Sequence, residues 1–461
     1  KSMASDLFKY MVKEHYFLKE VFNMKRIFVS GLTSSGYGGM EFHNLGNFII
    51  VEPLFENLRK VFPDYEICTT MQMTTGFYER HRLIPKNEER FWRQSSPRTL
   101  ALSLIDLIRV MMYKIIRLDW LLKSTLLQEI NRSDIYLDFS GDIYGDNANA
   151  IAFIEASLRI LLAKFLGKKT AIIIGSPGPF SSIWRQYIAK KVIQQTDLIT
   201  NREPLSTAML AYIGIKGDHI HSTACPSIFF RKEDIENMPR NSDYSKLFAQ
   251  RKPTIGFILC GWNMAGFPYN KWPRSDSEYQ PFMDLIHYIL ERTDYRICVM
   301  SHQNATDSKG NLVRGNDHKI IDRLLELLGE TKERVFTLEG LYTASQSKTI
   351  ISTFDVLISG RIHGAVQGLS QYIPTMIIDY GHEPKAHKLR GFARVYGIDD
   401  YVADPCDGKN LIMCASKLLD NKLLIQDHLK RKVPEVMRLA NSNFELIKCL
   451  LSEGTVLKSK K

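Results

Sequence analysis

The sequence lacks several features that would by themselves point to a particular class of protein. It has no CxxC pair, no uninterrupted apolar run long enough to cross a bilayer, and no dense Lys/Arg tract interleaved with aromatic residues. Its seven cysteines are scattered and odd in number, which argues against a disulfide framework or a zinc site and favours a reducing, cytoplasmic compartment. No secretory signal is expected. The lack of zinc-finger and RNA-recognition signatures argues against nucleic acid as a partner.

The composition is that of a globular protein. Of the 461 residues, 44% are hydrophobic and 24% are charged. A chain of this length is too long for one ordinary core and fits two domains of about 200 residues each. The formal net charge of +11 favours anionic partners such as phosphorylated metabolites, acidic glycans or an anionic membrane surface.

Both halves of the chain alternate apolar, strand-like runs with helical stretches, as parallel α/β units do. In the first half, strands are predicted at 25–30, 65–70, 134–139, 170–175 and 197–201. In the second half, strands are predicted at 254–259, 295–300, 334–337, 356–359 and 375–378, with helices at 281–292, 317–328 and 364–371. The predicted fold class is α/β, with two Rossmann-like domains facing each other across a cleft.

A charged passage without strand signals, at 231–252, is typical of an interdomain linker. We therefore expect a leader segment at 1–23, an N-terminal domain at 24–240, a C-terminal domain at 241–415 and a helical extension at 416–461. The extension is expected to return across the domain junction.

The most apolar stretch, residues 100–122, has the pattern of an amphipathic helix. Its polar residues gather on one stripe at helical spacing and leave a wide apolar face; they are Ser103, Asp106, Arg109, Lys114 and Arg117. Two interpretations stay open, a helix packed on the sheet and a basic helix that rests peripherally on a membrane surface.

Two glycine-containing segments follow predicted strands of the first half. The first holds Gly31, Gly36, Gly38 and Gly39, then Asn44, Gly46 and Asn47, and suits either an anion-binding loop or a merely tight turn. The second is DFSGDIYGDN, whose Asp142 and Asp146 could meet ligand hydroxyls at a strand's carboxyl end, or could cap a helix.

Two further loops follow the next strands. The segment GSPGPF, residues 175–180 with Gly178 at its centre, reads locally as a rigid turn. Arg202 follows the strand after it, and its planar guanidinium suits a carboxylate or phosphate. A salt bridge at the helix start, with Glu203 or a neighbour, is the competing explanation.

The most specific pattern is SGRIHG, residues 359–364. It places Arg361 and His363 between a strand's carboxyl end and a helix N-terminus, which suits anion binding and proton transfer. Tyr380 and Lys385 follow the next strand and are expected close by, and His302 is a weaker candidate after the 295–300 strand.

In order and spacing, these segments resemble the polysaccharide pyruvyl transferase family. The resemblance covers roughly residues 25 to 404. Its landmarks are Asn44, Gly46 and Asn47 for the family's Asn-x-Gly-Asp, with Asn47 replacing the acid; Ser140–Asp146 for its glycine-rich segment; Gly178, Pro179 and Phe180 for its GPF loop; Arg202, Glu203 and Ser206 for its Arg-acid-x-x-Ser stretch; SGRIHG; and Pro374, Tyr380 and Lys385.

The resemblance implies a GT-B-like fold, phosphoenolpyruvate as donor and a glycan or lipid-linked saccharide as acceptor. We hypothesise that His363 is the general acid and base, that Arg361 and Arg202 clamp the donor, and that Lys385 assists the leaving phosphate. Asp142 or Asp146 would orient acceptor hydroxyls. The reaction is expected to need neither a cofactor nor a metal, and to take place in the cytoplasm or peripherally at the inner membrane face.

Two rival functions stay open. A GT-B glycosyltransferase that uses a nucleotide sugar would share the architecture, and a non-catalytic glycan-binding protein could also be built on it. The combination of Arg361, His363 and Lys385 argues against the second, because a binding module has no use for a proton-transfer residue beside an anion clamp.

Overall fold

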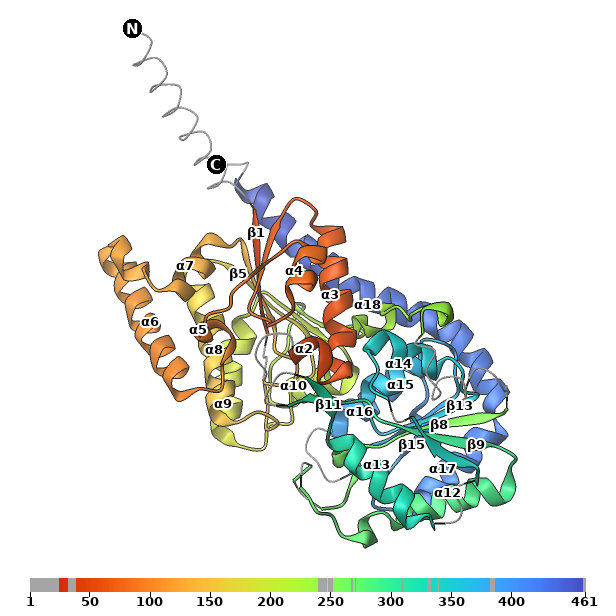
Figure 1. Cartoon of the computed structure of the whole chain (residues 1–461). Coiled ribbons are helices and arrows are strands. Elements are labelled where there is room, and N and C mark those ends of the chain that lie inside the picture. Colours follow the sequence, from red (N-terminus) through yellow and green to blue (C-terminus); the bar gives the residue numbers. More distant parts are fainter. Residues whose placement is uncertain are drawn as a thin grey trace.

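The structure is a computed structural model and describes residues 25–31, 39–238, 247, 252–266, 268–269, 271–307, 311–329, 333–338, 340–381 and 386–458. The predictions for 1–23, Gly36, Gly38 and Lys385 therefore lie outside the described residues. Two sheets with helices packed around them form two lobes that lie side by side (Figure 1).

The first lobe is built on a seven-stranded parallel sheet of order β3-β2-β1-β4-β5-β6-β7. Its strands are β1 (Arg26–Gly31), β2 (Glu66–Thr69), β3 (Leu83–Pro85), β4 (Ile135–Phe139), β5 (Lys169–Gly175), β6 (Leu198–Asn201) and β7 (Ile220–Ser222). Its helices are α2 (Gly39–Phe42), α3 (Leu45–Val61), α4 (Thr75–His81), α5 (Glu89–Trp92), α6 (Pro97–Ile116), α7 (Thr125–Arg132), α8 (Ala150–Phe165), α9 (Ile183–Val192) and α10 (Pro204–Tyr212). The central strands are buried on both faces, as their continuous apolar runs predict.

The second lobe is built on a six-stranded parallel sheet of order β12-β9-β8-β13-β14-β15. Its strands are β8 (Thr254–Ile258), β9 (Arg296–Met300), β12 (Val335–Thr337), β13 (Val356–Ser359), β14 (Thr375–Ile378) and β15 (Val402–Ala403). Its helices are α12 (Gln280–Arg292), α13 (Asn316–Leu327), α14 (Ala344–Ile351), α15 (Ile362–Leu369), α16 (His387–Tyr396) and α17 (Gly408–Asp420). A small antiparallel hairpin, β10 (Asn304–Thr306) with β11 (Leu312–Arg314), stands beside this sheet.

All ten predicted strands are confirmed within one or two residues at their ends. The sequence prediction missed β3, β7, β10, β11 and β15, which have two or three residues each. Such strands are too short to show an apolar periodicity, and β3, β7 and β15 lie at sheet edges, where burial is incomplete.

The strand order of each sheet reverses once near its centre. In the first lobe the reversal lies between β1 and β4, and in the second between β8 and β13. Ligands of open parallel sheets bind outside the carboxyl ends of the strands at such switch points. The residues that follow these four strands are therefore the first place to look for a site.

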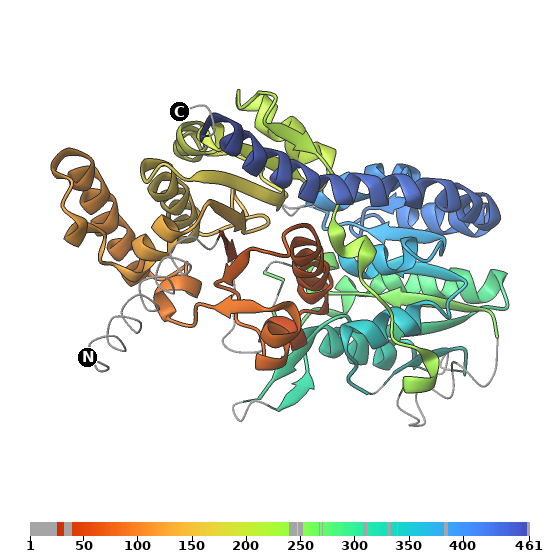
Figure 2. The same cartoon turned by 90° about the horizontal axis from the view of Figure 1, so that it is seen from above.

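A helix of 37 residues, α18 (Lys422–Lys458), runs along both lobes (Figure 2). It packs on α16 and α17 of the second lobe and on β5, β6 and α3 of the first. In the first lobe, Asn443 accepts a hydrogen bond from Thr223 Oγ1 at 2.9 Å and donates one to the carbonyl oxygen of Ala224 at 3.0 Å. The helix crosses the junction as the pattern of the last 40 residues predicts, and we propose domain boundaries at residues 240 and 415.

Candidate active site

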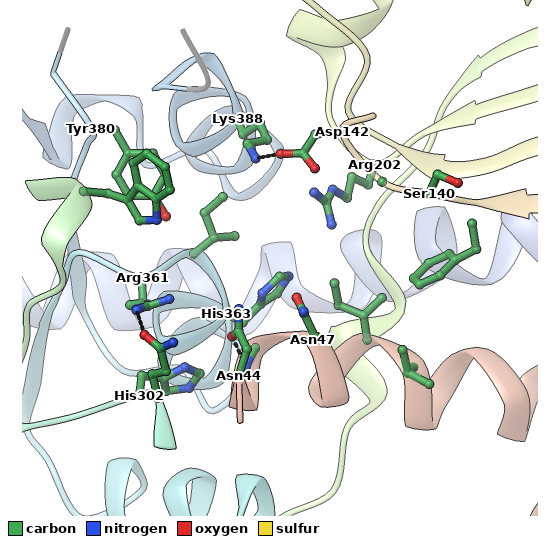
Figure 3. Close-up of a pocket in the computed structure, with 18 of the residues that line it drawn as sticks. Asn44, Asn47, Ser140, Asp142, Arg202, His302, Arg361, His363, Tyr380 and Lys388 are labelled. Atoms are coloured by element: carbon green, nitrogen blue, oxygen red, sulfur yellow. Dashed lines mark hydrogen bonds and ion pairs between the residues drawn. The ribbon is translucent and has the colours of Figure 1, made fainter. Parts of the chain in front are cut away.

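A cavity of about 350 Å³ lies between the two lobes, at the carboxyl ends of both sheets (Figure 3). Most of the predicted site residues line it, namely Asn44, Gly46, Asn47, Asp142, Arg202, His302, Arg361, His363 and Tyr380. They come from the loops after β1, β4 and β6 in the first lobe and after β9, β13 and β14 in the second. The two switch points thus face each other across one site.

The first lobe contributes the N-terminus of α3. The Asn44 side chain caps this helix by accepting a hydrogen bond from the Gly46 amide at 3.1 Å. A Cβ atom at Gly46 would lie 2.8 Å from Nδ1 of His363 in the other lobe. Glycine is therefore the residue that lets this helix approach the imidazole so closely.

His363 lies in the first turn of α15, whose N-cap is Arg361. Its Nε2 atom is buried and has no hydrogen-bond partner among the described residues, while its ring meets the edge of Phe392 at 6.2 Å. Burial lowers the pKa of His363 well below its ordinary value. The charges of Arg202, Lys388 and Arg361 lower this pKa further. The imidazole is accordingly neutral at pH 7.

Arg361 is held by an acid that the sequence analysis did not identify. Its Nε and Nη2 atoms donate to the two carboxylate oxygens of Asp317 at 3.0 and 2.6 Å, and Nη2 also donates to Gln303 at 2.8 Å. Burial would lower the pKa of Arg361, but Asp317 raises it overall. The guanidinium is fixed in place and its charge is partly balanced, so it is not a free anion clamp.

Arg202 is the cation that stands without an acidic partner. Its Nε donates to Ser176 Oγ at 2.8 Å and its guanidinium lies 5.6 Å from the centre of the Phe392 ring. No carboxylate of a described residue lies within 4.0 Å of it. The alternative of an ion pair with Glu203 is wrong, because Glu203 caps α10 by accepting from the Ser206 amide at 3.1 Å.

The sequence analysis also missed Lys388, in the first turn of α16. Its ammonium lines the cavity and forms an ion pair with Asp142 across the lobes (Figure 3). The predicted Lys385 lies outside the described residues. The sequence offered one signal for Lys388, because it follows Lys385 by three residues in the same segment.

One wall of the cavity is aromatic and belongs to the second lobe. Trp262 and Tyr269 stack with ring centres 3.9 Å apart and planes 17° apart, and Tyr380 lies 5.9 Å from Trp262. Neighbouring Asn263 donates to the carbonyl oxygens of Gly360, Ile378 and Asp379 at 3.4, 3.3 and 3.0 Å. This amide ties the ends of β13 and β14 together below the site.

His302 also lines the cavity. Its Nε2 is 3.2 Å from Gln367 Oε1, and its Nδ1 is buried without a hydrogen-bond partner among the described residues. Burial, then the charge of Arg361, lowers the pKa of His302 to about 3. This imidazole is also neutral at pH 7.

The structure does not bring Asp146 and Gly178 to the cavity. Asp146 accepts from the Ser181 amide at 2.6 Å and lies 3.6 Å from Arg185. Gly178 packs against Gly145. A Cβ atom added at Gly145 would come within 2.8 Å of the carbonyl group of Gly178. Asp146 and Gly178 thus hold the loops after β4 and β5 together, as residues of a rigid turn do.

The electrostatics of the cavity suit a small anion with several charges. Arg202, Arg361 and Lys388 face it together with the N-terminal ends of α3 and α15, against the two acids Asp142 and Asp317. Among the described residues, no group of three or more His, Cys, Asp or Glu side chains is arranged to hold a metal ion.

Comparison with protein families matches residues 44–382 to the polysaccharide pyruvyl transferase model. The chain belongs to this family. It is therefore a transferase of polysaccharide biosynthesis, and a glycan is the acceptor class that the family implies. A search of curated proteins found no match.

Solved structures share the fold at low sequence identity. A glycosyltransferase from Rickettsia africae superposes with a TM-score of 0.55 at 11% identity, over 95% of this chain and 99% of that one. A UDP-GlcNAc 2-epimerase from Neisseria meningitidis, bound to UDP-GlcNAc, gives a TM-score of 0.52 at 12% identity, over 93% and 100%. A putative UDP-N-acetylglucosamine 2-epimerase from Listeria monocytogenes gives 0.51 at 12%, over 89% and 91%. The pyruvyl transferase thus has the predicted GT-B-like fold of two facing Rossmann-like domains.

Within the described part of the pyruvyl transferase, no helix combines the length and the apolar character that crossing a bilayer requires.

Proposed function

We propose that the enzyme transfers the pyruvyl group of phosphoenolpyruvate to two hydroxyls of a glycan, forming a cyclic ketal and releasing phosphate. The observation that carries this proposal is the buried Nε2 of His363, which has no hydrogen-bond partner in the described part of the chain. It lies in a cavity that also holds Arg202, Arg361 and Lys388. A proton-transfer group among cations is what an enol phosphate needs, because the donor is strongly anionic and reacts by protonation at carbon.

The donor would lie between the lobes, where its charges meet cations from both sides. Arg202 is the side chain best placed to take the phosphate or carboxylate, since no acid of the described residues neutralises it. Arg361, oriented by Asp317, would present the remaining edge of its guanidinium to the other anionic group. We propose that Lys388 assists the leaving phosphate, whereas Lys385, predicted for this role, lies outside the described residues.

The protons balance through one imidazole. His363, protonated once the donor is bound, gives its proton to the methylene carbon, and the first hydroxyl attacks the central carbon while His363 takes a proton back. The bond between this carbon and the bridging oxygen then breaks and phosphate leaves. The second hydroxyl attacks the same carbon while the phosphate is still in the site, and the phosphate takes this proton before it diffuses away. Each turnover returns His363 to its starting state.

The acceptor is proposed to meet the aromatic wall and Asp142. Flat aromatic faces such as Trp262 and Tyr380 suit the apolar face of a sugar ring, and the Asp142 carboxylate can accept from a hydroxyl. We propose that this saccharide is lipid-linked, which places the reaction at the cytoplasmic face of a membrane. For residues 100–122 the sequence leaves two interpretations open, a helix packed on the sheet and a contact with that membrane.

The test is to incubate the purified chain with phosphoenolpyruvate and candidate glycans, and to follow phosphate release together with the mass of the glycan. His363→Gln is expected to lower turnover by about 10²–10⁴. His287→Gln, on α12, is the matched control and should leave turnover unchanged. Phosphate release at the native rate by the His363 variant would disprove the assignment.

A nucleotide-sugar donor is the second candidate, favoured by the stacked pair of Trp262 and Tyr269, on which a base could lie. Thermal shift separates the two candidates, because only a ligand that binds the folded state raises the melting temperature. Stabilisation by UDP-sugars with none by phosphoenolpyruvate would favour the glycosyltransferase.

A further inference from the structure

Helix α6 packs against the first lobe with its polar side inward. Ser103 and Asp106 are buried against α5 and α8, where Arg90 donates to Ser103 at 2.9 Å and to Asp106 at 3.0 Å. Ser103 in turn donates to Glu155 at 2.8 Å. The part of the polar stripe that holds Ser103 and Asp106 thus lies on the packed side of the helix.

This arrangement is fixed by a buried network of ions. Glu155, fully buried on α8, accepts from Arg90 at 3.3 Å and from the equally buried Arg159 at 2.9 Å. Arg159 also donates to the carbonyl oxygens of Phe91 and Arg90 at 2.7 and 2.8 Å. Breaking such a network leaves an uncompensated buried charge, so α6 cannot simply turn over to hide its apolar side.

The consequence is a continuous apolar face on the outside of the protein. Ile108, Met111 and Ile115 are spaced at three and four residues along α6 and are 59%, 54% and 84% exposed. Trp120, just beyond the helix, is 56% exposed. Figures 1 and 2 both place α6 at the outer edge of the first lobe, away from the second lobe. A face of this kind marks an interaction surface.

The charges beside this face indicate what covers it. Residues 97–123 carry five cations, and their only acid besides the buried Asp106 is Asp119; the cations are Arg98, Arg109, Lys114, Arg117 and Lys123. Arg109 reaches back to Asp106 at 3.3 Å, while Arg117 ends the helix. An apolar face with an exposed tryptophan and flanking cations matches the boundary of an anionic bilayer, where apolar side chains insert and cations meet headgroups.

We propose that the apolar face of α6 docks the enzyme on an anionic lipid bilayer. The face lies on the first lobe, so the bound protein would keep its second lobe away from the lipid. This inference goes beyond pyruvyl transfer and does not need it, because lipid binding is measured without donor or acceptor.

The test is sedimentation of the full chain with vesicles of phosphatidylcholine, with and without phosphatidylglycerol. The wild-type chain should bind the anionic vesicles. The triple variant Ile108→Ser/Met111→Ser/Ile115→Ser should bind them at least about tenfold more weakly, since three inserted side chains are lost. The matched control is Leu423→Ser/Leu424→Ser on α18, where both residues are similarly exposed, and it should bind like the wild type.

A charge variant examines the second half of the proposal. Arg117→Gln/Lys123→Gln should weaken binding to anionic vesicles by about fivefold for each cation removed, and should leave binding to neutral vesicles unchanged. Circular dichroism confirms that each variant is folded.

Three results would overturn the proposal. They are a wild-type chain that does not sediment with anionic vesicles, a triple variant that binds as well as the wild type, and a dimer that the triple variant dissociates while no lipid binding is seen. The last would mean that a second copy covers the face.

Discussion

Proton uptake on donor binding is the sharpest consequence of the site around His363. Without the donor the imidazole is neutral at pH 7, because burial and then the charges of neighbouring cations, Arg202 first, lower its pKa. Phosphoenolpyruvate brings a carboxylate and a phosphate into the same cavity. We therefore expect donor binding to raise the pKa of His363 and to draw a proton from the solvent.

The expected size follows from the charges involved. One unit charge at about 5 Å, with an effective dielectric constant of about 20, interacts by about 3 kcal/mol, which corresponds to about two pKa units. Two or more such charges oppose the effects of the cations and of burial on this pKa. We therefore expect a net uptake of up to about one proton per site at pH 7. By linkage, the affinity for phosphoenolpyruvate should rise as the pH falls from 8 to 6.

Isothermal titration calorimetry in buffers of different ionisation enthalpy measures this proton number directly. His363→Gln is the reference, because the donor's own phosphate titrates equally in both proteins. His302→Gln is the second reference, because His302 lines the same cavity and the donor's charges would raise its pKa of about 3 as well. Equal proton numbers for wild type and variant would refute the assignment of His363 as the acid.

Three further predictions concern the packing around the site and beneath α6. Gly46→Ala puts a methyl group 2.8 Å from Nδ1 of His363 and should lower kcat by at least about tenfold in the phosphate-release assay, whereas Gly76→Ala, with open space around it, should not. Glu155→Gln should lower the free energy of unfolding in urea by about 3–5 kcal/mol, and the exposed Glu89→Gln by less than about 1 kcal/mol. Lowering the pH from 7 to 5 should lower the free energy of unfolding by about 2 kcal/mol through His302, because this imidazole binds its proton near pH 6.5 in the unfolded chain and only near 3 in the folded chain. The melting temperature of His302→Gln should therefore depend less on pH than that of the wild type.

The sequence predicted the sheets well because their central strands are buried on both faces and stand between glycine-rich turns. The runs that became β5 and β13 are apolar throughout, so no tertiary information was needed to find them. The site residues that follow strands were found for the same reason, since parallel strands bring their carboxyl ends to one edge. Arg202 and His363 are 161 positions apart in the sequence (363 minus 202), and both line the cavity because each follows a strand of a parallel sheet.

Residues that act through tertiary contacts could not be found this way. Asp317 lies in the first turn of α13, and nothing near it in the sequence indicates that it binds Arg361. Asn263 and Lys388 are equally ordinary in their local context. The predicted Asp146 has the opposite problem, because its position after a strand suggests a ligand while nearby backbone and Arg185 already satisfy it.

Helix α6 shows the limit of periodicity most clearly. The pattern reveals that the helix has a polar and an apolar side, but which side faces inward is decided by partners elsewhere in the chain. Arg90 and Glu155 supply a buried polar surface that matches Ser103 and Asp106, and this match fixes the orientation.

The division of charge between the lobes explains why the chemistry is expected at their junction. The first lobe supplies Arg202 and Asp142, and the second supplies Arg361, Lys388 and His363. In the site as a whole, Asp317 balances Arg361, and Asp142 from the other lobe balances Lys388. The remaining cation, Arg202, comes from the first lobe, whereas the proton-transfer group, His363, comes from the second. A donor with two anionic groups has its full set of partners only where both lobes meet, so a change that separates the lobes should abolish donor binding even if each lobe stays folded.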